Sequence, residues 1–292
     1  MFGAIPFPDI SPEIVSFTIF GLEIALRWYA MAYIVGIAIG WQIIKFALNR
    51  PALWRDGPPM QVSQLEDLLT YVVVGVIGGG RLGYVFFYKP GEYLSNPIDI
   101  LKIWEGGLSF HGGFLGVVVA VFLFSRRKKI PLADLADIIA VSAGPAIFLV
   151  RIANFINAEL WGRQTDAPWG VIFPGQAAQA CATALEPCVR HPSQLYEAGL
   201  EGLLLGTLLI VLAFRFGALK KSWLLSGLFF AVYGMARFLV EFVRQPDAQF
   251  VSVGNELGLA FQISGYGLTM GQSLTLPMIV VGLTVVMLAS RR

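Results

Sequence analysis

The chain has 292 residues, of which 56% are hydrophobic and only 14% carry a charge. A soluble domain usually has about a quarter of its residues charged, so this composition excludes an ordinary soluble protein and favours one that crosses a membrane several times. The formal net charge of +2 and the lack of a basic patch with interleaved aromatic residues exclude nucleic acid as a partner.

Seven apolar runs of helix length predict an all-α polytopic integral membrane protein, a single membrane domain that takes up residues 1–292. Several of these runs have roughly 20 residues, the length that crosses the apolar part of a bilayer. No basic stretch precedes the first run, so we expect no cleaved signal peptide. The seven expected spans lie near residues 22–47, 65–88, 110–125, 133–150, 194–214, 222–243 and 271–289.

Basic residues gather in alternate loops and predict the orientation of the spans. Lys45, Arg50 and Arg55 lie at the end of the first span and after it, and residues 126–129 (Arg-Arg-Lys-Lys) follow the third. Arg215, Lys220 and Lys221 follow the fifth, and Arg291 and Arg292 close the chain. Because basic loops mark the cytoplasmic side, we expect the N-terminus outside and the C-terminus in the cytoplasm.

The longest of the outward loops, residues 151–193, is rich in proline and shows little periodicity. We expect it to form a small external cap without a hydrophobic core of its own. The only two cysteines, Cys181 and Cys188, lie in this loop. The sequence does not decide whether these two cysteines form a disulfide or remain free thiols.

Residues 151–163 read Arg-Ile-Ala-Asn-Phe-Ile-Asn-Ala-Glu-Leu-Trp-Gly-Arg and begin where an apolar run ends. Arg151 and Asn154 share one helical face, and Asn157 and Glu159 follow closely. An arginine and amides at the mouth of a membrane helix can hold an oxyanion such as a phosphate. The alternative is an arginine whose charged end only reaches the lipid headgroups.

Further ionisable groups lie in the outer halves of the expected spans, where each costs roughly 2.5–3.5 kcal/mol on insertion scales. Tyr233, Arg237, Glu241 and Arg244 are spaced by 4, 4 and 3 residues and form one polar stripe on a helix. Arg81 and His111 lie on two other spans. Structural ion pairs and an interfacial histidine are the alternatives for single residues, but the set together predicts a cavity for an anionic headgroup.

At these residues the chain resembles bacterial prolipoprotein diacylglyceryl transferases. The most specific match is the stretch from Arg151 to Gly162. The other family-like segments are Arg27-Trp28-Tyr29, Gly80 to Tyr84, Gly107 to Gly113, His191 to Glu197, Tyr233 to Asp247, and Met270 to Gln272. Together they extend over nearly the whole chain.

The resemblance implies a multi-pass enzyme of the bacterial cytoplasmic (inner) membrane with its active site toward the outer leaflet. It implies transfer of the sn-1,2-diacylglyceryl group from phosphatidylglycerol to the lipobox cysteine in a preprolipoprotein signal peptide. The products are a thioether and glycerol 1-phosphate, and no metal or cofactor is expected. The expected catalytic residues are His111, Arg151, Arg237 and Tyr29, and those expected to bind the lipid are Arg151, Arg237, Arg81, Asn154, Asn157, Glu159, Tyr233, Glu241 and Arg244.

The chemistry of these residues fits that reaction. A thiol with a pKa of ~8.5 is only about 3% ionised at pH 7. His111 is suited to take its proton, because histidine titrates nearest to neutral pH. Arg151 and Arg237 are suited to stabilise the negative charge that grows on the departing phosphate. We expect Glu159 and Glu241 to orient arginines, and Tyr29 to bind the headgroup or the thiol.

The main alternative is a phospholipid-binding transporter or flippase, which would use the same arginines. It would need a polar path through the bilayer, and the inner halves of the spans are almost purely apolar. A membrane phosphatase would need a second catalytic histidine or an aspartate-rich metal motif, and the sequence contains neither.

Overall fold

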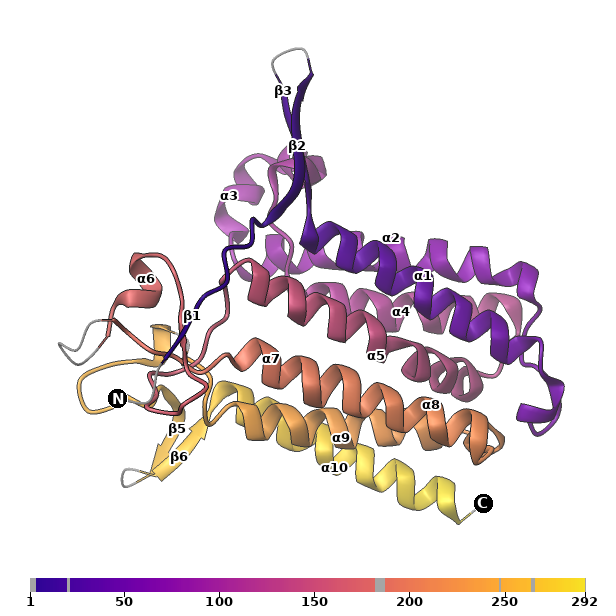
Figure 1. The fold of residues 1–292 in the computed structure, drawn as a ribbon. Coiled ribbons are helices and arrows are strands. Elements are labelled where there is room, and N and C mark those ends of the chain that lie inside the picture. Colours follow the sequence, from indigo (N-terminus) through magenta and orange to yellow (C-terminus); the bar gives the residue numbers. More distant parts are fainter. Residues whose placement is uncertain (1–3, 20–21, 182–186, 247, 264–265, 292) are drawn as a thin grey trace. The chain divides into compact units, whose positions relative to one another are not determined.

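The fold is seen in a computed structural model that describes residues 4–19, 22–181, 187–246, 248–263 and 266–291 (Figure 1). The chain divides into two compact units. One unit consists of Met1–Ile43 with Ile139–Arg292, and the other is Ile44–Ile138.

The unit Ile44–Ile138 is built on two long helices, α2 (Leu65–Phe87) and α4 (Phe110–Lys128), which pack side by side. Their backbones come so close that a Cβ on Gly116 would overlap the carbonyl oxygen of Gly75. Short helices precede and connect them, namely η1 (Pro51–Leu53), η2 (Val62–Gln64), α3 (Pro90–Ser95), η3 (Pro97–Leu101) and η4 (Ile103–Glu105). The glycine-rich sequence of α2 is therefore explained by helix packing.

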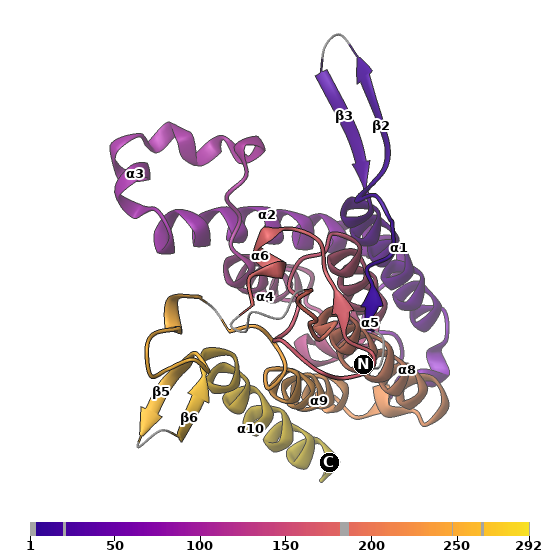
Figure 2. The same cartoon turned by 60° about the vertical axis from the view of Figure 1, so that its left-hand side comes forward.

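The larger unit holds most of α1 (Trp28–Leu48) and of α5 (Leu132–Ile156), together with α9 (Leu224–Val240) and α10 (Met270–Ser290). Its other long helix runs from Ser193 to Arg215. This helix consists of α7 (Ser193–Glu197), a π-helical segment η5 (Ala198–Leu204) and α8 (Leu205–Arg215), and η6 (Ala218–Lys220) follows it. Helices α8, α9 and α10 lie side by side in both views (Figures 1 and 2).

Helices occupy all seven positions at which spans are predicted. Five of them are long and apolar enough to cross a membrane: Trp28–Leu48, Val62–Phe87, Leu132–Ile156, Ser193–Arg215 and Met270–Ser290. Helices α4 and α9 are not among these five. The class of a mostly helical, polytopic membrane protein is confirmed, whereas the count of seven spans and their orientation stay predictions.

The prediction of an all-α fold is wrong in the loops, which contain three two-stranded sheets. Their strands are β1 (Ile5–Pro6) with β4 (Val171–Ile172), β2 (Glu13–Ile19) with β3 (Leu22–Arg27), and β5 (Leu259–Ile263) with β6 (Tyr266–Thr269). The β1–β4 pair is parallel, and the other two are antiparallel hairpins (Figure 2). The first helix consequently begins at Trp28 and not near residue 22. Hydropathy alone does not separate an apolar strand from the start of an apolar helix.

The segment 151–193, called the cap below because it is predicted to form an external cap, has a small hydrophobic core, contrary to the prediction that it lacks one. Val171, Phe173 and Ala178 form this core, and Phe7 from the N-terminal segment packs against it. The ring of Phe7 lies 5.2 Å from that of Phe155 and 5.5 Å from that of Phe173. The sequence does not show that an N-terminal segment supplies an aromatic ring to a loop far along the chain. Short segments complete this part of the unit, namely α6 (Gln176–Gln179) and η7 (Ala248–Phe250).

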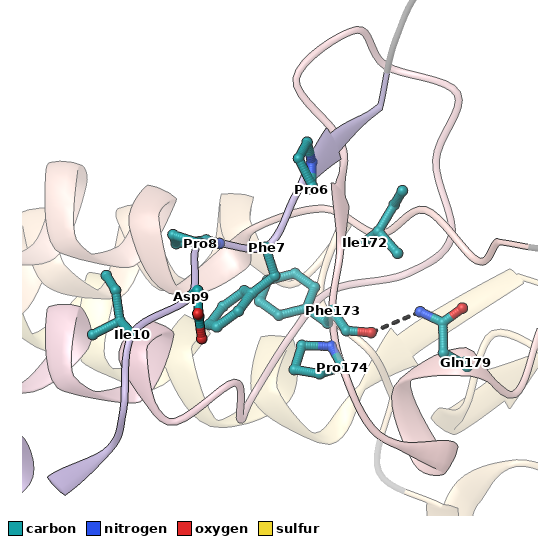
Figure 3. A pocket seen from close by; sticks show the side chains of 9 residues that line it. All are labelled: Pro6, Phe7, Pro8, Asp9, Ile10, Ile172, Phe173, Pro174 and Gln179. Carbon is teal, nitrogen blue, oxygen red and sulfur yellow. Dashed lines mark hydrogen bonds between the residues drawn. The ribbon is translucent and has the colours of Figure 1, made fainter.

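An open hollow of about 500 Å³ lies on the surface of the cap (Figure 3). Residues 6–10 and 172–174 form its walls. Gln179 lines the hollow and donates a hydrogen bond to the carbonyl oxygen of Phe173 at 2.7 Å. The hydrogen bond lies within the segment 151–193, whereas the packing of Phe7 and the β1–β4 pair join the N-terminal segment to it.

Cys181 and Cys188 form a disulfide, which resolves the choice that the sequence leaves open. Closing so short a loop stabilises the folded cap by roughly 2–3 kcal/mol in the chain-entropy account. We therefore expect the double variant Cys181→Ala/Cys188→Ala to raise the hydrogen-exchange rate of amides 171–180 by about 30- to 150-fold. Wild-type protein treated with a reductant should show the same rise, and unchanged exchange in both samples would contradict this role of the disulfide.

Candidate active site

Three arginines and three carboxylates meet inside the larger unit. Arg151 lies near the end of α5, and its two terminal nitrogens pair with Glu197 Oε2 at 3.0 Å and Glu201 Oε2 at 3.1 Å. Both carboxylates are almost fully buried, with side chains 1% and 0% exposed. Glu197 ends α7 and Glu201 lies in the π-helical segment that follows. A π-helical turn of this kind is frequent at functional sites.

The polar stripe of α9 completes the cluster. Arg237 Nη1 lies 2.5 Å from Glu241 Oε2, and Arg244 Nη1 lies 3.3 Å from Glu197 Oε1. Thr269 donates a hydrogen bond to the other oxygen of Glu241 at 3.0 Å. The predicted spacing of 4, 4 and 3 residues thus places Arg237, Glu241 and Arg244 in one site. With all six groups ionised, the three positive and three negative charges balance.

A second polar group follows Arg151 at the end of α5. Asn154 donates a hydrogen bond to Glu159 Oε1 at 2.7 Å, and Asn157 donates to the same oxygen at 3.5 Å. The Glu159 carboxylate thus accepts hydrogen bonds from two amides, and its role in orienting an arginine stays a prediction. Gln194, which is fully buried, donates to the backbone oxygen of Glu159 at 2.5 Å.

The backbone around Glu159 is strained. Ala158 and Leu160 have φ angles of +53° and +57°. This is a left-handed backbone conformation that residues other than glycine rarely adopt. Such residues persist where the surrounding structure holds them, and they concentrate at functional sites. The hydrogen bonds of Asn154 and Gln194 supply that support and fix the direction of the Glu159 carboxylate.

Gly162 joins three segments of the site. Its N–H donates to His191 O at 2.8 Å, and the next residue, Arg163, donates its N–H to Val243 O at 2.8 Å. A Cβ on Gly162 would lie 2.5 Å from Val243 O and 2.7 Å from the Cβ of His191. Only glycine therefore lets the chain after α5 lie between the start of α7 and the end of α9.

His191 lies at this junction, outside the membrane-spanning segments, and its side chain belongs to the cap. Trp169 Nε1 donates to the hydroxyl of Tyr196 at 2.7 Å, and this hydroxyl lies 3.0 Å from His191 Nδ1. The indole can only donate, so the tyrosine proton is available to Nδ1. Burial lowers the pKa of His191 below its usual value, and the imidazole thus stays neutral near pH 7.

The predicted tyrosines lie in the same unit. Tyr233 lies one turn before Arg237 on α9. The hydroxyl of Tyr29 lies 3.4 Å from that of Tyr33, a residue that is not among the predicted site residues.

Arg81 and His111 belong to the other unit, Ile44–Ile138. Arg81 is buried, and its guanidinium donates to the carbonyl oxygens of Asp99, Ile100, Gly106 and Gly107 at 2.6 to 3.3 Å. This arrangement makes Arg81 an anchor for the loop between α3 and α4. His111 is an exposed residue in the first turn of α4. The lipid-binding role of Arg81 and the catalytic role of His111 stay predictions.

We expect Arg81→Lys to loosen residues 97–107, because a lysine ammonium cannot reproduce the fork of N–H donors. Hydrogen bonds to charged groups are worth about 1.5–3 kcal/mol each, so tryptic cleavage after Lys102 should accelerate at least about tenfold. Lys89→Gln, which changes an exposed ion pair with Glu92, is the matched control. Unchanged cleavage with weakened lipid binding would instead support the predicted headgroup contact.

Two central carboxylates, Glu197 and Glu201, are not among the predicted site residues, although Glu197 ends one of the family-like segments. A signal for them exists, since they lie four residues apart at the start of a predicted span, where charges are costly. Gln194 lies three residues before Glu197 on the same helix, and its burial is also consistent with a polar face directed into the protein.

The fold and the site define a class, namely a polytopic helical membrane protein with half-buried arginines that buried carboxylates balance. The family model described as prolipoprotein diacylglyceryl transferase matches residues 15–288. The chain belongs to this family.

Several curated relatives are similar over almost their full length, and each is named phosphatidylglycerol–prolipoprotein diacylglyceryl transferase. The protein of Roseobacter denitrificans is 61% identical, with 97% of each chain covered. That of Cereibacter sphaeroides is 61% identical over 99% of this chain and 98% of its own. That of Methylocella silvestris is 47% identical over 99% of this chain and 97% of its own. The family resemblance drawn from the motifs is confirmed.

Proposed function

We propose that this chain is a phosphatidylglycerol–prolipoprotein diacylglyceryl transferase. It transfers the diacylglyceryl group of phosphatidylglycerol to the lipobox cysteine of a preprolipoprotein. The observation that supports this most strongly is the half-buried cluster of Arg151, Arg237 and Arg244, in a chain 61% identical to proteins of that name. Guanidinium groups bind phosphate through paired, charge-assisted hydrogen bonds.

The transfer makes one bond and breaks one. The cysteine sulfur bonds to the glycerol carbon that carries the phosphate, and the bond between that carbon and the phosphate oxygen breaks. Its electron pair leaves with glycerol 1-phosphate, while the thiol proton passes to a base. Negative charge therefore shifts from sulfur to the phosphate, and the site must stabilise that charge most strongly as the carbon–oxygen bond breaks.

Arg151 and Arg237 are proposed to stabilise the departing phosphate. They project from α5 and α9, and ion pairs with Glu197, Glu201 and Glu241 hold them before the lipid binds, so little reorganisation is needed during the reaction. Asn154 and Asn157, held by Glu159, supply neutral donors and acceptors suited to the glycerol hydroxyls of the headgroup. Tyr233, Glu241 and Arg244 complete this lipid site.

His111 is proposed to accept the thiol proton, and Tyr29 to bind the headgroup or the thiol. The acceptor thiol is mostly protonated at pH 7, and histidine is the side chain best suited to remove its proton there. No cysteine of this chain takes part, because Cys181 and Cys188 are joined to each other.

The orientation proposed from the basic loops places the cap on the outer face of the bacterial inner membrane. The disulfide between Cys181 and Cys188 supports this, because disulfides persist in oxidising compartments outside the cytoplasm. The active site would then lie toward the outer leaflet, with phosphatidylglycerol and the signal peptide entering from the membrane.

The test uses purified protein in detergent with phosphatidylglycerol and a short lipobox peptide. Mass spectrometry should detect a diacylglyceryl adduct on the peptide cysteine. No adduct should form with a Cys→Ser peptide or when phosphatidylethanolamine replaces phosphatidylglycerol. If folded protein binds the lipid but forms no adduct, the transferase function is wrong. Movement of phosphatidylglycerol between liposome leaflets without peptide would then favour the transporter.

A further inference from the structure

Glu197 contacts all three arginines of the site, although they come from different segments. Its Oε2 lies 3.0 Å from Arg151 Nη1, and its Oε1 lies 3.3 Å from Arg244 Nη1 and 3.9 Å from Arg237 Nη1. The Glu197 side chain is 1% exposed, while the arginine side chains are 15–21% exposed. The carboxylate therefore lies beneath the three guanidinium groups, which keep some access to the surface.

The other two carboxylates have narrower roles. Glu201 pairs with Arg151, and Glu241 pairs with Arg237 and accepts a hydrogen bond from Thr269. Among the residues that the structure describes, Glu197 is the one carboxylate paired with all three arginines. Three positive charges held this close repel one another, and a shared carboxylate offsets that repulsion.

We infer that Glu197 is a positioning residue that holds the three arginines in place for the lipid phosphate. The inference rests on the proposed function. Glu197 accepts a hydrogen bond from Arg244 Nη1 at 3.3 Å and forms ion pairs with Arg151 and Arg237, so its charge both orders the arginines and weakens the binding of an anion. An anion that enters from the exposed side would bind the remaining donors of arginines already in position. The ground state of the lipid is therefore bound weakly, and the arginines stabilise the transition state more strongly, which raises kcat.

The matched variants are Glu197→Gln and Glu201→Gln. Both remove one buried negative charge and keep the side-chain shape, but the first affects three arginines and the second affects Arg151 alone. Glu197→Asp tests whether restoring the charge restores the function. Glu92→Gln, which alters an exposed ion pair with Lys89, controls for a general loss of charge.

Two readouts are needed, steady-state transfer and binding of glycerol 1-phosphate measured by its shift of the thermal unfolding midpoint. For Glu197→Gln we expect kcat to fall at least tenfold, KM for phosphatidylglycerol to fall at least threefold, and glycerol 1-phosphate to bind at least threefold more tightly. A purely structural loss would not tighten anion binding. Glu197→Asp should recover part of kcat, and Glu201→Gln should show smaller changes in both readouts.

The inference is overturned if Glu197→Gln keeps wild-type kcat and KM, if its KM rises, or if Glu201→Gln changes both readouts equally. It is also overturned if the folded variant binds glycerol 1-phosphate no more tightly than wild type. Failure of the proposed function looks different, because wild-type protein would then form no adduct at all. The binding series would still report whether Glu197 controls anion affinity.

Discussion

Replacing Arg151 by alanine should lower kcat/KM for transfer by at least about 10³-fold. Removing one preorganised donor to a developing oxyanion costs about 10²–10³ in rate by itself. The change also leaves Glu197 and Glu201 buried without their shared partner, and breaking such buried pairs costs roughly 3–5 kcal/mol. The measurement is adduct formation by mass spectrometry at varied phosphatidylglycerol concentration.

Three further variants separate catalysis from folding. Arg151→Lys keeps the charge but loses the two-nitrogen fork, and should still lose most of the activity. Arg151→Ala/Glu201→Gln should regain thermal stability relative to Arg151→Ala without regaining activity, because it removes one unpaired carboxylate. Arg215→Ala, at the exposed end of α8, should behave like wild type. Near-normal turnover by folded Arg151→Ala would exclude Arg151 from stabilising the phosphate.

The periodicity of the sequence predicts one side of the site well. The residues from Tyr233 to Arg244 lie on a single helix and its continuation, so their spacing alone places Arg237, Glu241 and Arg244 together. Apolar runs likewise predict the positions of the helices, because length and hydropathy are local properties. The β-hairpins fall outside that prediction, since their pairing depends on segments that hydropathy does not align.

The partners of each residue are harder to predict, because they come from distant segments. Glu159 is close to Arg151 in sequence, yet it binds Asn154 and Asn157, while Arg151 pairs with Glu197 and Glu201 far along the chain. The left-handed backbone around Glu159 redirects its side chain, and composition gives no sign of this. The helix with Glu197 also contains a π-helical segment, which alters the faces expected from a period of 3.6 residues.

The hydrogen-bond partners of Arg81 are also difficult to predict from the sequence. A charge next to three glycines in a predicted span suggests an anion site. A charged side chain inside a membrane costs free energy, and such residues are usually functional. In the structure its donors bind backbone carbonyl oxygens of the following loop. Because every residue has a backbone carbonyl group, the sequence does not show which carbonyl oxygens accept hydrogen bonds from Arg81. Weaker lipid binding by Arg81→Lys without faster tryptic cleavage would show that Arg81 also contacts the headgroup.

Replacing His111 by glutamine should lower kcat about 30-fold at pH 7 and hardly at all near pH 10. Without a base the reaction depends on thiol that is already ionised, which is about 3% at pH 7 for a pKa of ~8.5. The remaining rate should therefore rise about tenfold per pH unit until the thiol is ionised. Wild-type enzyme should show a much weaker rise, because its base removes the proton during the reaction.

The other histidine provides the control for this prediction. His191→Gln changes a cap side chain that interacts with Tyr196, and should keep the wild-type pH profile of transfer. Wild-type turnover by His111→Gln at pH 7 would exclude His111 as the base. A 30-fold loss that persists near pH 10 would mean that His111 orients a substrate, because ionising the thiol would then fail to restore the rate. Only recovery at high pH assigns the proton transfer to His111, since that pattern requires the variant to lack a base and nothing else.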